Sequence, residues 1–280
     1  MSRAIVVVPC YNEAKRLDAR ALREFAREHS EPRFLFVDDG STDGTRELLD
    51  ELHCEAPQRF LVCHLRRNAG KAEAVRQGLL RAFEEQPDYV GYWDADLATP
   101  LAAIRTFCSI LDFRPDIDMV FGARVCLHGR AVLRKPVRHY LGRVFATAAS
   151  LALGVHFYDT QCGAKLFRAT TEVKALFVTR FRTRWIFDVE ILARAIAARR
   201  GTSRPGIEQA IYEFPLHEWN DVAGSKLKPL DWMKAFFGLA VIRWTYRRIV
   251  RLEGRGPAAP HSGKPHVIEA STPTSVSAAR

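Results

Sequence analysis

The sequence predicts an α/β fold built on a mostly parallel central sheet flanked by helices. In the first hundred residues, segments of strand type and of helix type alternate four times. The first strand segment, 4–8, is a β-branched run, as expected for a parallel strand buried on both faces. Each polar cluster directly follows a strand segment, and open parallel sheets bind ligands at the carboxyl ends of their strands. The fold class therefore also predicts where the functional site lies.

The apolar spacing predicts the elements in chain order. The expected strands cover residues 4–8, 34–37, 60–65, 89–93, 119–124 and 211–216, with a short further strand after the polar loop 158–163. The expected helices carry the apolar faces of residues 17–25, 45–53, 75–83, 101–112, 140–155, 185–192 and 230–250. A proline-, glycine- and serine-rich stretch follows, and we expect residues 253–280 to form a disordered tail.

Composition indicates the size of the domain and the kind of partner that the protein binds. A chain of 280 residues forms one large α/β domain, or a domain with an appendage. The net charge of +10 indicates an anionic partner, such as a phosphorylated substrate or an acidic membrane face, unless the basic residues merely form a solvated surface. Nucleic acid is not an expected partner, because the basic residues are not interleaved with aromatic residues on a sheet face.

Cysteine spacing and hydropathy predict a cytosolic location. The six cysteines form no C-x-x-C pair, so we interpret them as reduced thiols. The apolar run at residues 4–8 is too short for a signal peptide, and no apolar run is long enough for a transmembrane helix.

Two carboxylates one residue apart, Asp94 and Asp96, end the strand 89–93. Such a pair is a weak signal alone, but three further polar clusters occupy the same position after a strand. These are residues 11–13, 38–39 and 68–71, and together they predict a nucleotide-type cleft. The sequence has no G-x-G-x-x-G and no Walker loop, so bound phosphates would need a cation or basic side chains.

Two apolar helices suggest contact with a membrane. The run 145–157 is uncharged and follows a stretch rich in arginine, so it would form a buried or an interfacial helix. The helix 230–250 is apolar on two sides and ends in four arginines. This pattern fits a helix lying among anionic headgroups, or one packed between two subunits of a homodimer.

Three motifs in this order resemble the family 2 glycosyltransferases: residues 8–13 (VPCYNE), 37–45 (VDDGSTDGT) and 94–96 (DAD). The resemblance covers residues 4–228. It implies a GT-A fold (the nucleotide-diphospho-sugar transferase fold), a nucleotide-sugar donor, a divalent metal and inversion at the anomeric carbon. Residues 159–167, 185–190 and 224–226 look like the branch that transfers sugar to polyprenyl or dolichyl phosphate. Ala98 stands where the mannose synthases of that branch carry a metal-binding Gln, which favours UDP-glucose over GDP-mannose as donor and the glucosyl enzymes as nearest relatives.

The resemblance also implies separate roles for different parts of the chain. Residues 1–228 would form the catalytic domain, with a donor half (1–125) and an acceptor half (126–228), followed by an interfacial helix at 229–252. The expected nucleotide-sugar residues are Pro9, Tyr11, Glu13, Asp38, Asp39, Lys71, Asp94, Ala95 and Asp96, and Asp94 and Asp96 would hold Mg²⁺ or Mn²⁺. The expected acceptor-phosphate residues are Arg124, Arg134, Arg138, Ser225 and Lys226. Asp96, Arg124 and Lys226 would act in catalysis, and Asp188 would serve as base if the acceptor were a hydroxyl.

Other functions stay open from sequence. A family 2 transferase could act on a hydroxyl of a polysaccharide, glycolipid or small acceptor, or on polyprenyl phosphate with GDP-mannose. A nucleotidyltransferase shares a similar sheet but carries a Gly-rich basic loop after its first strand, where this chain has residues 10–13. A non-catalytic nucleotide-binding protein would bind UDP without metal dependence or turnover.

Overall fold

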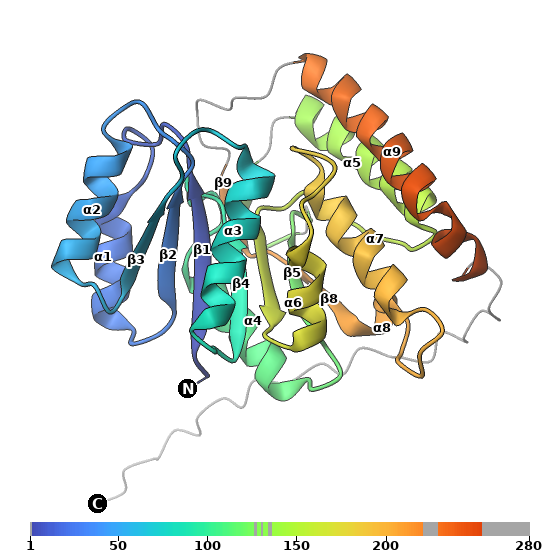
Figure 1. The fold of residues 1–280 in the computed structure, drawn as a ribbon, viewed down its shortest axis with the longest axis horizontal. Helices are drawn as coiled ribbons and strands as arrows, with labels where there is room; N and C mark the ends of the chain where they lie inside the picture. The colour runs from blue at the N-terminus through green and yellow to red at the C-terminus, as the bar shows by residue number, and fades with distance from the viewer. Residues whose placement is uncertain (1, 126–127, 130, 134–135, 221–228, 254–280) are drawn as a thin grey trace, which may run out of the picture.

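A seven-stranded sheet with the order β3-β2-β1-β4-β7-β5-β8 runs through the computed structural model of the chain (Figure 1). The structure describes residues 2–125, 128–129, 131–133, 136–220 and 229–253. The strands of the sheet are β1 (Ala4–Cys10), β2 (Arg33–Asp38), β3 (Phe60–His64), β4 (Tyr89–Trp93), β5 (Met119–Ala123), β7 (Ala164–Arg168) and β8 (Ile211–Pro215). A small separate sheet pairs β6 (Ala131–Leu133) with β9 (Glu218–Asn220).

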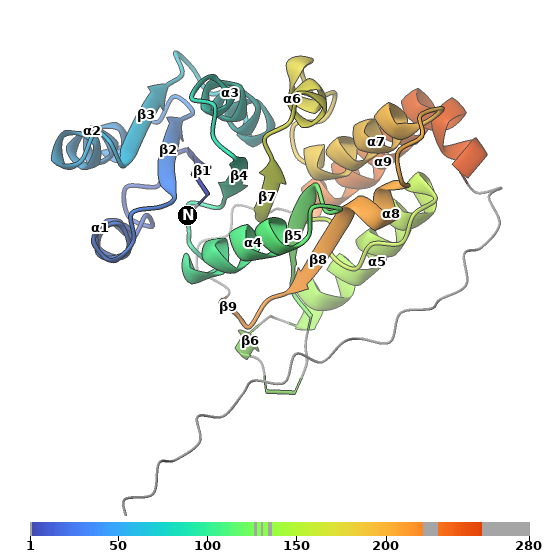
Figure 2. The ribbon, with the colours of Figure 1, turned by 90° about the horizontal axis from the view of Figure 1, so that it is seen from below.

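Helices cover both faces of the sheet (Figure 2). One face packs against α1 (Ala19–Glu28), α2 (Thr45–Glu55) and α4 (Ala102–Phe113). The other side carries α3 (Lys71–Glu84), α5 (Pro136–Leu153), α6 (Thr171–Val178), α7 (Phe187–Arg199) and α8 (Ile207–Ala210), and α9 (Pro229–Glu253) packs on α5 and α7. The sheet is thus buried on both sides, as its apolar strands predict.

Helix α3 lies unusually close to the sheet. A Cβ on Gly78 would lie 2.4 Å from a methyl carbon of Val7 in β1, so only glycine allows this approach. The contact fixes the start of α3, at Lys71, beside the carboxyl ends of β1 and β4.

Strand β7 is the one strand of this sheet that runs antiparallel to its neighbours, β4 and β5. Its first residue, Ala164, pairs with Trp93, the last residue of β4. The segment that precedes β7 therefore reaches the same edge as the Asp94–Asp96 turn. Nothing in the apolar pattern of residues 164–168 indicated this reversal of direction.

Most expected elements are present within a few residues of their predicted bounds. The sequence did not predict β6, α6, α8 or β9. Among the described residues, no helix is both long enough and apolar enough to cross a bilayer. The predicted tail lies outside the described residues from 254 onward.

Candidate active site

The loops that follow the first three strands are joined by hydrogen bonds. The backbone N–H groups of Ala69 and Gly70 donate to the two carboxylate oxygens of Asp39, at 2.7 and 2.8 Å. The backbone N–H of Asn12 donates to the hydroxyl of Ser41 at 3.0 Å. The predicted convergence of these clusters on one edge of the sheet is therefore present.

The two neighbouring aspartates after β2 differ in their surroundings. Asp38 is fully buried and accepts hydrogen bonds from the Ser41 N–H and from His64 Nδ1, at 2.9 and 3.1 Å. Burial raises the pKa of Asp38, but the hydrogen bonds from Ser41 and His64 outweigh it and hold the pKa below its usual value. Burial raises the pKa of Asp39 above its usual value despite its two backbone donors. Asp38 orders its own loop, and its predicted contact with a nucleotide stays a prediction.

Each carboxylate of the Asp94–Asp96 pair meets a cation from this chain. Lys71, the first residue of α3, forms an ion pair with Asp94. Arg16 reaches Asp96 at 3.0 Å and Glu13 at 3.3 Å, and so links the loop after β1 to the turn after β4. Burial raises the pKa of Asp96, and the nearby charge of Asp94 raises it further. The turn thus concentrates negative charge that favours a cation.

This donor set fits a divalent metal that is bound together with a substrate. Magnesium ions are commonly held by one or two carboxylates plus substrate phosphates, with water completing the shell. In the described part of the chain, no group of three or more His, Cys, Asp or Glu side chains could hold a metal by itself. Asp94 and Asp96 are the residues that would hold such a metal together with substrate phosphates, and this role stays a prediction.

The position of Asp94 depends on a glycine from the loop before β7. The backbone N–H of Asp94 donates to the carbonyl of Gly163 at 3.0 Å. A Cβ on Gly163 would lie 1.9 Å from an oxygen of the Asp94 side chain. Any other residue at 163 would push that carboxylate away.

A buried charge network lies beneath this turn. Lys165 of β7 donates to Asp188 at 2.5 Å and to the carbonyls of Thr160 and Cys162, at 3.2 and 2.5 Å. The hydroxyl of Tyr92 donates to the same Asp188 oxygen, and burial followed by this carboxylate raises the Tyr92 pKa well above its usual value. Asp188 therefore fixes the loop 160–163 through Lys165, and its predicted role as a base stays a prediction.

Arg124 lies just beyond β5 and is held by Asp159. Its guanidinium contacts both carboxylate oxygens, at 2.6 and 2.8 Å, and lies 5.4 Å from the ring centre of Trp219. Burial lowers the pKa of Arg124, but the pairing with Asp159 outweighs it and raises the pKa above its usual value. Its charge is compensated within the protein, so its predicted contact with an acceptor phosphate stays a prediction.

The remaining predicted residues are placed as follows. Tyr11 is exposed beside the edge of the sheet, and Pro9, Glu13 and Ala95 are wholly or largely buried there. Arg134, Ser225 and Lys226 lie outside the described residues, and Arg138 lies in α5. Residues that the sequence did not single out include Arg16, Gly163, Lys165 and Tyr92 in the roles given above.

Comparison with known proteins agrees with this geometry. Residues 5–171 match the model of glycosyl transferase family 2. A dolichyl-phosphate beta-glucosyltransferase of Trichomonas vaginalis is 32% identical over 86% of this chain and 71% of its own length. The enzymes of that name from Saccharomyces cerevisiae and Homo sapiens are 29% and 28% identical over 86% of this chain and 74% and 75% of theirs.

Solved structures show the fold. A Mycobacterium tuberculosis glucosyl-3-phosphoglycerate synthase, solved in complex with Mn²⁺, UDP and glucosyl-3-phosphoglycerate, superimposes with a TM-score of 0.56 at 16% identity. The alignment covers 89% of this chain and 81% of that one. The same enzyme in complex with UDP gives a TM-score of 0.58 at 19% identity over the same shares. The predicted GT-A-like fold is confirmed.

Proposed function

Because the chain belongs to glycosyl transferase family 2, we propose that it moves glucose from UDP-glucose to a polyprenyl or dolichyl phosphate. The family makes the chain a glycosyltransferase. The names of its relatives support dolichyl phosphate as acceptor and glucose as the sugar. The donor is inferred from the structural neighbours that were solved with UDP.

One observation carries the proposal: the carboxylates that follow β2 and β4 lie at the same edge of the sheet. Residues 69–71, at the start of α3, connect them, because the backbone of 69 and 70 binds Asp39 and the side chain of Lys71 binds Asp94. In the proposal, Asp39 accepts from the uracil N–H, and Tyr11 and Pro9 line the base and ribose. Asp94 and Asp96, pre-positioned by Lys71 and Arg16, face the diphosphate. A bound Mg²⁺ or Mn²⁺ would neutralise charge on the departing diphosphate.

The proposed reaction needs no strong base. An oxygen of the lipid phosphate attacks the anomeric carbon, the bond from that carbon to the UDP oxygen breaks, and the configuration inverts. The acceptor phosphate is already an anion near pH 7, so no proton has to be removed from it. This agrees with the state of the Asp188 carboxylate, which already accepts hydrogen bonds from Lys165 and Tyr92. Arg124, Arg134, Arg138, Ser225 and Lys226 remain the proposed acceptor-phosphate residues.

A lipid acceptor requires a surface that meets the membrane, and we place it on α5 and α9, which lie side by side (Figure 1). Arg243 of α9 donates to the carbonyl of Leu151 at the end of α5, at 3.0 Å. Both helices carry exposed apolar side chains: Tyr140, Val144 and Leu151 on α5, and Met233, Phe236, Phe237 and Trp244 on α9. Such a surface fits the headgroup region of the cytosolic leaflet, and contact with a second subunit is the alternative.

The test is transfer of radiolabelled sugar from a panel of UDP- and GDP-sugars to polyprenyl phosphate, with and without EDTA. We expect transfer from UDP-glucose that EDTA abolishes. Transfer from GDP-mannose alone would replace the proposed donor. Transfer only to hydroxyl acceptors would replace the proposed acceptor, and UDP binding without any turnover would indicate a non-catalytic protein.

A further inference from the structure

The loop between α6 and α7 carries three arginines at alternating positions, Arg180, Arg182 and Arg184. All three side chains are exposed, while Phe181 and Thr183 between them are partly buried. The resemblance and the proposed function assign no role to these arginines. The loop nevertheless has a defined position, because charged groups hold its backbone from two sides.

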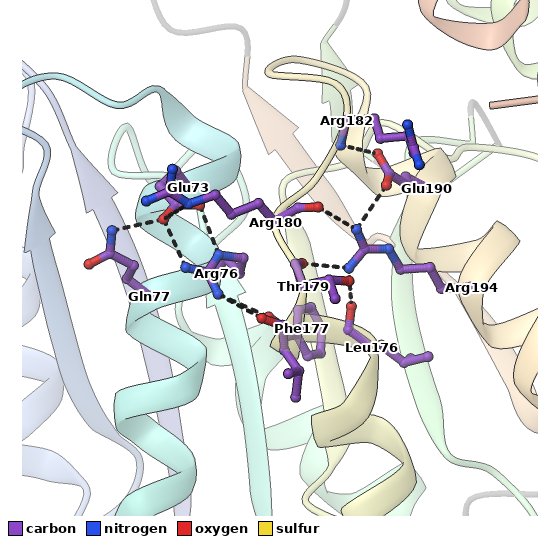
Figure 3. A network of polar contacts seen from close by, with 11 residues as sticks. Glu73, Arg76, Gln77, Leu176, Phe177, Thr179, Arg180, Arg182, Glu190 and Arg194 are labelled. Atoms are coloured by element: carbon purple, nitrogen blue, oxygen red, sulfur yellow. Dashed lines mark hydrogen bonds and ion pairs between the residues drawn. The ribbon is translucent and has the colours of Figure 1, made fainter. Parts of the chain in front are cut away.

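On one side, α7 holds the loop through a buried ion pair (Figure 3). Glu190 is fully buried and accepts from the backbone N–H of Arg182 at 2.9 Å. Arg194 pairs with Glu190 at 2.9 Å and donates to the carbonyls of Thr179 and Arg180, both at 2.8 Å. A buried carboxylate committed to backbone groups fixes the path of the loop.

On the other side, α3 of the donor half holds the loop and the end of α6 (Figure 3). Arg76 donates to the carbonyls of Phe177 and Val178, at 3.3 and 3.1 Å. Glu73 pairs with Arg76 at 2.8 Å and lies 3.6 Å from the guanidinium of Arg180. The loop therefore bridges α7 and α3, and α3 begins at the candidate active site.

This bridge places Arg184 over the start of α3. The Nε of Arg184 lies 3.2 Å from the point that a Cβ on Gly70 would occupy. Gly70 is one of the two residues whose backbone N–H groups donate to Asp39, and the charge of Arg184 acts to lower the pKa of Asp39 against the larger, opposing effect of burial. Within the part of the chain that the structure describes, Arg184 makes no hydrogen bond or ion pair.

We propose that Arg184 binds the diphosphate of the nucleotide donor from the side opposite the Asp94–Asp96 pair. The inference rests on the proposed function. The neighbouring cation, Lys71, is already paired with Asp94, whereas the guanidinium of Arg184 still has its donors available beside the same loop. A guanidinium presents parallel N–H donors that match two phosphate oxygens, so a nucleoside diphosphate is the ligand whose chemistry fits.

The experiment is calorimetric titration of UDP, and of uridine by competition, into the full-length wild-type chain and its variants. We expect Arg184→Ala to weaken UDP binding about 20-fold, the loss of one charge-assisted phosphate contact, and to leave uridine binding unchanged. Arg184→Lys should recover part of the loss. Arg182→Ala is the matched control, since Arg182 lies two residues away on the same anchored loop, and it should bind UDP like the wild type.

The outcomes separate this inference from the function on which it rests. A wild type that binds no UDP would overturn both. Wild-type affinity for UDP in Arg184→Ala would overturn the role of Arg184 and leave the proposed function standing. An equal loss of UDP and uridine binding would place Arg184 on the nucleoside and overturn the diphosphate contact. If Arg184→Ala raised only the KM for the lipid phosphate, Arg184 would bind the acceptor, and the diphosphate contact would again be overturned.

Discussion

The proposed donor half (residues 1–125) and the proposed acceptor half (residues 126–228) are built differently. In the proposed donor half, the candidate carboxylates follow parallel strands directly and contact groups that follow other strands, as Asp39 contacts Ala69 and Gly70. In the proposed acceptor half, the buried groups nearest this edge are paired with one another, as Asp188 is with Lys165. Arg124, at the junction, is held by Asp159 of the acceptor half.

The difference follows from the direction of one strand. Parallel strands bring successive loops to the same edge, so polar residues after the strands meet there with little further support. Because β7 is antiparallel, the acceptor half reaches that edge with the loop before the strand, which needs Lys165 to fix it from below. The comparison predicts that substitutions directly after β2 and β4 affect binding of metal and nucleotide, and that substitutions at Lys165 and Asp188 mainly affect the position of the loop 160–163.

The largest effect is expected from Asp96→Asn in the donor half. It removes one of the two carboxylates available to a metal, and we expect a loss of transfer of about 10³-fold, near 4 kcal/mol in the barrier. Asp116→Asn, the same change at an exposed side chain paired with Arg114, is the control and should retain activity. Full, EDTA-resistant transfer by Asp96→Asn would show that the metal assignment is wrong.

The next effect is on stability, in the acceptor half. Asp188→Asn removes the charge that faces the buried Lys165 ammonium, and we expect the free energy of unfolding to fall by about 3 kcal/mol. Urea denaturation measures it, again with Asp116→Asn for comparison. Wild-type stability together with an altered pH profile for hydroxyl acceptors would instead identify Asp188 as a base.

Gly163→Ala tests the contact between the two halves. The new Cβ would displace the Asp94 carboxylate, and we expect transfer to fall about 10²-fold while the protein stays folded. Gly206→Ala is the matched control, because its Cβ would meet no atom within 4 Å. The measurements are kcat and circular dichroism, and retained kcat in Gly163→Ala would show that the position of Asp94 is not critical.

The smallest effect is expected outside both halves, on α9. Changing Phe237 and Trp244 to Glu should weaken binding to anionic liposomes about tenfold without changing UDP affinity, because two exposed apolar side chains become charged. Phe113→Glu, at an exposed residue of α4, is the control. Unchanged liposome flotation combined with loss of a dimer in ultracentrifugation would assign the α9 surface to a subunit contact.

From the sequence we could identify those candidate site residues that directly follow a strand, because the strand alone determines where they lie. Asp39, Asp94 and Asp96 could be found because each lies directly after an apolar strand run. Arg16, Gly163 and Arg184 could not, because they reach the site through contacts with residues far away in the chain. The Asp159 partner of Arg124, 35 residues away, could not be found from the sequence either, and the predicted phosphate contact of Arg124 stays a prediction.

The contacts of α7 limit how far this chain could be shortened. The match to the family ends at residue 171, where α6 begins, yet α7 supplies the carboxylate that faces Lys165 and much of the apolar surface on that side of the sheet. A fragment trimmed to the matched region would leave a buried ammonium without its counter-charge and a bare sheet face. The smallest unit able to fold by itself therefore extends past the matched region through α7, and boundaries for expression are better chosen from contacts than from similarity.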